Sequence, residues 1–161
     1  MKRVAITLAI LLILAICGVG FLYVDCAVTV TAMGANVTEA ASQPELFQAL
    51  ALQVEQGAVT GTSFTDSTYL ESAENYQLIT YTIRLKNTCF VTADQVELQI
   101  TPMDGDVLQV GDTTPKALSA HTTGDIQVTL LTAIGMHTAR EMTLTYYMWG
   151  LPFTQKFSYS R

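Results

Sequence analysis

The run of uncharged residues from Val4 to Val24 restricts the fold of this chain more than any other feature. It contains 21 residues and no Asp, Glu, Lys or Arg. A helix rises about 1.5 Å per residue, so a helix of this length spans the roughly 30 Å hydrocarbon layer of a bilayer. Backbone groups in hydrocarbon have no water to bond, so a single spanning segment has to be helical. We therefore predict a transmembrane anchor helix at 4–24, with the lipid bilayer as its partner.

The charges that flank this run predict its orientation. Lys2 and Arg3 precede it, and Asp25 follows it. Basic residues next to a membrane segment favour the cytoplasmic side. We expect residues 1–3 to form a cytoplasmic tip of a single-pass protein of the cell membrane, with the C-terminal domain extracytoplasmic.

Two other kinds of leader were weighed against the anchor. A cleaved signal peptide has an apolar core of about 7–15 residues and ends at a small-x-small site. The run here is longer, and Val24-Asp25-Cys26 is a poor cleavage site. The segment 14–17 loosely resembles a lipoprotein signal, but Ile16 stands where that pattern has Gly, Ala or Ser. The length of the run favours an uncleaved signal-anchor.

Length and charge bound the rest of the chain. The 161 residues allow one domain. After residue 24 there are six basic and 14 acidic residues, a net charge of −8. A domain of this sign repels phosphate backbones. We therefore expect no nucleic-acid partner.

From residue 27 onward, apolar residues mostly recur at every second position, which is typical of half-buried strands. Residues 79–86 alternate most clearly, and 153–159 form the last strand of a hairpin after a turn at 150–152. The other predicted strands are at 28–31, 96–100, 107–110, 126–130 and 142–148. About seven short strands separated by turn residues predict an antiparallel β-sandwich over 27–161.

One helix is expected within this β-domain, at about 43–56. Ser42-Gln43-Pro44-Glu45 has the pattern of a capping box with Pro early in the helix. Leu46, Phe47, Leu50 and Val54 then share one face, and Gly57 supplies a stop. The apolar face predicts that this helix packs on a sheet.

The strand Tyr81–Asn87, followed by Ala93, Val96 and Leu98, resembles an immunoglobulin-like domain of the bacterial adhesion-related type. Residues 118–130 resemble the second half of such a domain. The chain departs from the pattern at Thr88 and Cys89, which replace the usual glycine. The whole layout is similar to small, uncharacterised single-anchor membrane proteins of Gram-positive gut bacteria. The resemblance implies a mainly β, immunoglobulin-like antiparallel sandwich with one inserted helix after an N-terminal transmembrane helix, and it implies no catalytic residue.

The chain has three cysteines, at positions 17, 26 and 89. Cys17 lies in the apolar run, where a small buried residue is expected. Cys26 and Cys89 would both face an oxidising compartment, which permits a disulfide. No spacing argument brings them together, so Cys26–Cys89 is a candidate disulfide that the sequence leaves open.

No residue pattern in the sequence predicts a catalytic or metal-binding site. His121 and His137 stand alone, and Asp104, Asp106 and Asp112 are better explained by a turn than by a calcium site. No Gly-x-Ser-x-Gly, His-Glu-x-x-His or Gly-rich phosphate loop occurs. We therefore expect no enzyme, no catalytic or metal-binding residue and no cofactor.

Aromatic residues concentrate in the last hairpin. Strand alternation sends about half of them outward, and we take Tyr147 and Trp149, with Phe153 as a neighbour, as the candidate partner surface. Core packing is the competing explanation.

These observations together favour a non-enzymatic, membrane-anchored extracytoplasmic domain that binds or scaffolds a protein or cell-wall partner. An alternative is an accessory subunit of a membrane complex, because Ala5, Ala9, Gly18 and Gly20 permit close helix contact. An exported hydrolase is a third, less favoured reading. The ligand, the oligomeric state and the biological process are not fixed by the sequence.

Overall fold

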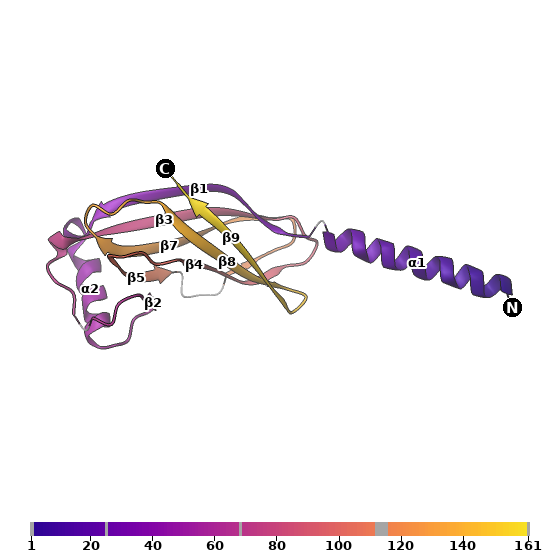
Figure 1. Cartoon of the computed structure of the whole chain (residues 1–161), viewed down its shortest axis with the longest axis horizontal. Helices are drawn as coiled ribbons and strands as arrows, with labels where there is room; N and C mark the ends of the chain where they lie inside the picture. Colours follow the sequence, from indigo (N-terminus) through magenta and orange to yellow (C-terminus); the bar gives the residue numbers. More distant parts are fainter. Residues whose placement is uncertain (1, 25, 68, 112–115, 161) are drawn as a thin grey trace.

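The structure is a computed structural model that describes residues 2–24, 26–67, 69–111 and 116–160. Within the first helix, the side chains of residues 2, 3, 5 and 21–24 are not described. Two antiparallel sheets form the body of the molecule, and one long helix extends away from them (Figure 1). The prediction of a mainly β fold with antiparallel sheets is confirmed.

The extended helix is α1 (Lys2–Val24), which covers the run predicted to be an anchor. Its described large apolar side chains are 53–68% exposed, so α1 does not pack on the sheets. Among the residues described, which omit the side chains at both ends of α1, no helix is found that is long and apolar enough to cross a membrane. The transmembrane role of 4–24 stays a prediction, and Asp25, its predicted outer flank, lies outside the described residues.

The first sheet has five strands, and all its pairs are antiparallel. In spatial order they are β1 (Val28–Glu39), β3 (Tyr76–Asn87), β7 (Thr123–Ala133), β5 (Asp106–Gly111) and β2 (Thr62–Ser63). The second sheet has four antiparallel strands. Their order is β6 (Lys116–Leu118), β4 (Ala93–Ile100), β8 (Arg140–Met148) and β9 (Leu151–Tyr159).

The two sheets pack face to face around the main core. Alternate residues of β3 and β7 meet alternate residues of β4 and β8, as the period-two pattern predicts. The fully buried members include Ile79, Tyr81, Ile83, Leu130 and Leu144. The sandwich therefore buries one face of each sheet against the other.

A second, smaller core lies on the outer face of the first sheet, under α2 (Pro44–Glu55). Phe47, Leu50 and Val54 are buried there against Leu78 and Leu131, whereas the predicted fourth member of the stripe, Leu46, is 40% exposed. Because both faces of β3 and β7 are covered at this end, neighbouring residues are buried there on opposite faces, as in Leu78-Ile79 and Leu130-Leu131. The short helices η1 (Ala40–Ser42) and η2 (Ala73–Asn75) border this core.

The predicted capping box of α2 is wrong. The N-cap is Gln43, without a side-chain cap, while the Ser42 hydroxyl donates to the Glu39 carbonyl 2.6 Å away. Ser42 already ends η1, so its side chain points to that turn. The predicted stop is present, because Gly57 has a φ of +64° and its N–H donates to the Val54 carbonyl.

The predicted last turn is displaced by one residue. The connection between β8 and β9 is Trp149-Gly150, with φ values of 52° and 74°, and Leu151 and Pro152 belong to β9. Positive φ at both central residues is the type I′ geometry that matches the twist of a hairpin. This two-residue turn fixes the register and pairs Tyr146 with Phe153.

Candidate functional site

The end of the sandwich from which α1 leaves is organised by a disulfide. Cys26 lies two residues after the end of α1, and the structure joins it to Cys89 in the connection between β3 and β4. The two cysteines are 63 positions apart in the sequence, and Cys89 is fully buried. This bond is the pairing that the sequence left open, and it ties the start of β1 to the far end of β3.

Asn87, the last residue of β3, holds the same connection in place. Its side-chain N–H groups donate to the carbonyls of Val91, Leu118 and Ser119 at 2.8–3.1 Å, and its side-chain oxygen accepts the Cys89 N–H at 2.9 Å. The side chain is completely buried. An amide is suited to this place because it both donates and accepts.

Two aromatic rings meet on the surface at this end. The rings of Phe90 and Trp149 lie 5.9 Å apart, and the two residues are 49% and 44% exposed. Leu151, next to the turn, is 53% exposed. Phe90 was not among the residues that the sequence singled out, because it lies outside the aromatic hairpin and follows a cysteine.

The role of Tyr147, Trp149 and Phe153 as a partner surface stays a prediction, but the structure does not place all three side chains on the outward face. Phe153 stacks on Tyr146 at 5.6 Å and packs against the main core, while Tyr147 is paired with Pro152 on the outward face and is half-buried. Residues paired across an antiparallel ladder share a face, so Phe153 follows Tyr146 inward. Only Trp149 of the three is exposed.

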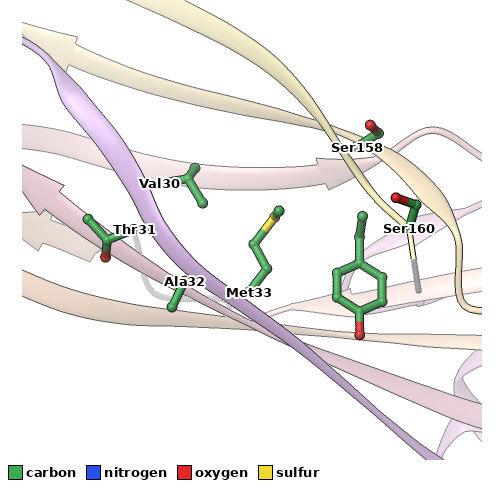
Figure 2. Close-up of a pocket in the computed structure, with 7 residues that line it drawn as sticks. Val30, Thr31, Ala32, Met33, Ser158 and Ser160 are labelled. Atoms are coloured by element: carbon green, nitrogen blue, oxygen red, sulfur yellow. The ribbon is translucent and has the colours of Figure 1, made fainter.

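A shallow groove runs between the end strands of the two sheets, β1 and β9. Its volume is about 490 Å³, with Val30, Thr31, Ala32 and Met33 on the β1 side and residues 158–160 on the β9 side. Figure 2 shows Val30 and Met33 on β1 facing the segment that carries Ser158 and Ser160. All seven lining residues are uncharged, and four of them carry a hydroxyl group.

A buried polar cluster lies at the opposite end of the sandwich, where the sequence predicted only a turn. The Asp106 carboxylate and the Arg140 guanidinium form an ion pair, with Oδ1 and Nη2 2.7 Å apart and both side chains 0% exposed. Arg140 also donates through Nη1 to the carbonyls of His137 and Ala139, both at 2.8 Å. Asp106 Oδ2 accepts the N–H of Met103 at 2.9 Å.

Tyr81 adds a phenol near this cluster. Its hydroxyl donates to the Thr138 carbonyl at 2.8 Å, and its ring lies edge-on to Tyr159. Burial is the main reason that the pKa of Tyr81 is raised to about 12; Arg140 lowers this pKa, while Asp106 and Tyr159 help to raise it. The phenol is therefore held neutral, as a hydrogen-bond donor.

The polar cluster is a structural element and does not have the properties of a reaction centre. Both charged groups are enclosed, and their polar atoms are bonded to the protein, which leaves no position for a substrate. Within the described part of the chain, no buried side-chain polar atom lacks a hydrogen-bond partner.

The remaining sequence candidates are dispersed. His121 lies in an exposed turn, where its N–H donates to the Cys89 carbonyl, and His137 is exposed beside Arg140. Asp106 is engaged by Arg140, and Asp112 lies outside the described residues. No group of three or more potential metal ligands occurs among the residues that are described.

Comparison of the chain with known proteins does not place it in a family. No protein-family model matches the chain. No curated protein matches it significantly. The basis for a function is therefore the chain's own side chains and their arrangement.

Proposed function

We propose that this chain is a non-enzymatic binding or scaffolding protein whose extracytoplasmic β-sandwich is held at the cell membrane by α1. The observation that carries the proposal is the exposure of the α1 side chains. Among the described residues, ten large apolar side chains of α1 are more than half exposed. They would not stay in water, since each such side chain gains roughly 1.5–3 kcal/mol when it is buried away from water. Because α1 does not pack on the sandwich, lipid is the environment we assign to it.

The disulfide next to α1 supports the extracytoplasmic side. Stable disulfides belong to oxidising compartments and are rare in the cytosol. Cys26 lies only two residues after the end of α1, so the side of the membrane reached by the end of α1 is the side on which the disulfide forms. Lys2 and Arg3 at the other end favour the cytoplasm there.

The order of the strands supports an immunoglobulin-like assignment for the sandwich. From β3 to β8, each successive strand lies in the other sheet. Such repeated crossing between two antiparallel sheets is typical of the Greek-key connections of immunoglobulin-like folds. That architecture hosts many unrelated functions, so it favours a binding role only in combination with the surface chemistry.

The surface chemistry favours binding over catalysis. The groove between β1 and β9 is lined by uncharged residues, and the buried pair Asp106–Arg140 is closed to solvent. Acid–base or nucleophilic catalysis needs a titratable group positioned against a substrate. A neutral, hydroxyl-rich surface instead suits a protein or cell-wall partner.

The anchoring proposal is tested on the full chain with a C-terminal tag, expressed in bacteria. We expect the chain to stay with membranes in alkaline carbonate and the tag to be removed by protease added outside spheroplasts. Leu12→Arg/Ile16→Arg should release the chain, because two arginines in the middle of a membrane helix cost about 5–7 kcal/mol. Leu12→Ile/Ile16→Leu is the matched control. Release of the unaltered chain by carbonate, or protection of its tag, would overturn the proposal.

Purification in mild detergent distinguishes an accessory subunit of a membrane complex from a self-contained binding domain. A subunit of a membrane complex brings one membrane protein along in fixed ratio, and a self-contained binding domain does not. Gly18 and Gly20 of α1 have no atom within 4 Å of the place where a side chain would be, so each of these two positions leaves room for a second helix.

A further inference from the structure

Three exposed apolar residues lie at the end of the sandwich next to α1. This group, the aromatic base, consists of Phe90, Trp149 and Leu151, which are 49%, 44% and 53% exposed. Phe90 and Trp149 are in ring contact, although they come from the β3–β4 connection and the β8–β9 turn. Figure 1 shows the β8–β9 turn directed toward the same end of the sheets as α1.

Covalent bonds keep Phe90, one member of the aromatic base, close to the end of α1. Val24 ends α1, Cys26 lies two residues further and is disulfide-bonded to Cys89, and Phe90 is the next residue. Two residues of chain span at most about 7 Å. Phe90 therefore lies close to the end of α1, whatever angle the sandwich makes with the helix.

The backbone conformation at Trp149 is one that tryptophan rarely adopts. Its φ of 52° lies in the left-handed region, which a bulky side chain rarely adopts and which Asn, Asp or Gly fills readily in hairpin turns of this type. Hairpin folding alone does not account for a tryptophan here. Backbone strain that a fold retains is a pointer to function.

We propose that the aromatic base lies in the headgroup layer of the bilayer that holds α1, so that the sandwich is seated on the membrane surface in one orientation. This inference rests on the proposed anchoring of α1. Trp is the side chain most suited to that layer, because its apolar rings and its N–H match a region that is apolar on one side and wet on the other.

The bilayer interface also limits which face of the sandwich meets a partner. With the β8–β9 turn at the membrane, α2 and the turn at Ile134 point away from it. β3 runs from Tyr76, near these elements, to Asn87 beside Cys89. Twelve residues of strand measure roughly 36 Å, so the two ends of the sandwich lie far apart.

The experiment uses the chain's single tryptophan as reporter. The full chain is reconstituted in phosphatidylcholine vesicles whose lipids carry bromine either high or low on the acyl chains. We expect Trp149 emission to be quenched by at least about half, more strongly by the shallow bromines, as for a tryptophan at the interface. The unaltered chain carries the reporter, so this measurement does not depend on a variant's folding.

The matched control moves the tryptophan to the other end of the sandwich. In Trp149→Phe/Ile134→Trp the new indole replaces a side chain that is 54% exposed. We expect its emission to be unaffected by either lipid. Formation of the Cys26–Cys89 disulfide, seen as a mobility shift on reduction, checks that the variant folds.

The outcomes distinguish this inference from the anchoring on which it rests. If the chain does not float with the vesicles in a density gradient, the proposed function fails. If it floats but Trp149 is not quenched, the anchor holds and the aromatic base is not in the bilayer. Equal quenching at positions 149 and 134 would also overturn the inference, because the sandwich would then have no preferred orientation.

Discussion

The carboxylate of Asp106 and the guanidinium of Arg140 form a fully buried ion pair that joins β5 of the first sheet to β8 of the second. Removing both charges from water is expensive, and the pair is stable because each group is surrounded by further hydrogen bonds. The pair therefore acts as a unit that holds the two sheets together at the end remote from α1.

Removing one charge of the Asp106–Arg140 pair should lower the free energy of unfolding more than replacing both residues with apolar ones. We expect Asp106→Asn to lower the free energy of unfolding by about 3–5 kcal/mol, because Arg140 is then a buried charge without a counter-charge. The double variant Asp106→Leu/Arg140→Met should be more stable than Asp106→Asn. Urea unfolding of the full chain in detergent, followed by circular dichroism, measures both.

A matched surface pair provides the control for this prediction. Arg84 and Asp125 also form an ion pair, at 2.8 Å, but their side chains are 57% and 41% exposed. Asp125→Asn should leave the unfolding midpoint almost unchanged, since an exposed charge remains hydrated. Equal losses from Asp106→Asn and Asp125→Asn would contradict the role assigned to burial.

Much of the sandwich could be predicted because several strands alternate between inward and outward residues over most of their length. In β8 the inward positions Met142, Leu144, Tyr146 and Met148 stand out against polar neighbours. Arg140 continues the same inward series, which is a signal for a buried, paired arginine. Its partner carries no such signal, because a bulge between Asp106 and Leu108 breaks the alternation of β5.

The candidate surface was harder to predict because it depends on register and on a long-range bond. The inward position of Phe153 follows from the exact residues of the β8–β9 turn, and a turn displaced by one residue reverses the face of every side chain after it. The contact between Phe90 and Trp149 joins two connections that are distant in the sequence. Local patterns carry no information about such a contact.

The disulfide should be a major source of stability for the β-domain. The chain-entropy relation for a loop closed by residues 63 positions apart gives about 4 kcal/mol. We expect Cys26→Ser/Cys89→Ser to lower the free energy of unfolding by about 3–4 kcal/mol. Urea unfolding at neutral pH, with and without reductant, measures the loss. Cys17→Ser is the control, because Cys17 is exposed on α1 outside the bond, and its replacement should change nothing.

The raised pKa of Tyr81 predicts that the folded protein loses stability at alkaline pH. Its pKa is raised from 10.0 to about 12 by burial, so the folded protein keeps the phenol proton more firmly than the unfolded chain does. This contribution is fully present below pH 10 and is lost as the pH rises toward 12. We expect up to about 2 kcal/mol to disappear over that interval, at about 1.4 kcal/mol per pKa unit.

Tyr81→Phe isolates this effect. The variant loses the hydrogen bond to the Thr138 carbonyl and is less stable at neutral pH, but its stability should fall less steeply above pH 10. Unfolding curves at several alkaline pH values, all in a Cys17→Ser background to avoid thiol exchange, give the two slopes. Parallel slopes would show that another group titrates.

Trp149 gives a prediction in which backbone strain and ring contact oppose each other. Trp149→Asn relieves the left-handed strain, worth about 1–2 kcal/mol, and loses the contact with Phe90, worth about 0.5–1.5 kcal/mol. Its stability should therefore stay within about 1 kcal/mol of the unaltered chain. Trp149→Ala loses the same contact and keeps the strain, so it should be less stable than Trp149→Asn by about 1 kcal/mol. Urea unfolding of both variants with and without Phe90→Ala tests this assignment, because Phe90→Ala should cost little once the indole is absent. If Trp149→Asn and Trp149→Ala unfold alike, the turn is not strained, and Trp149 occupies it without a penalty.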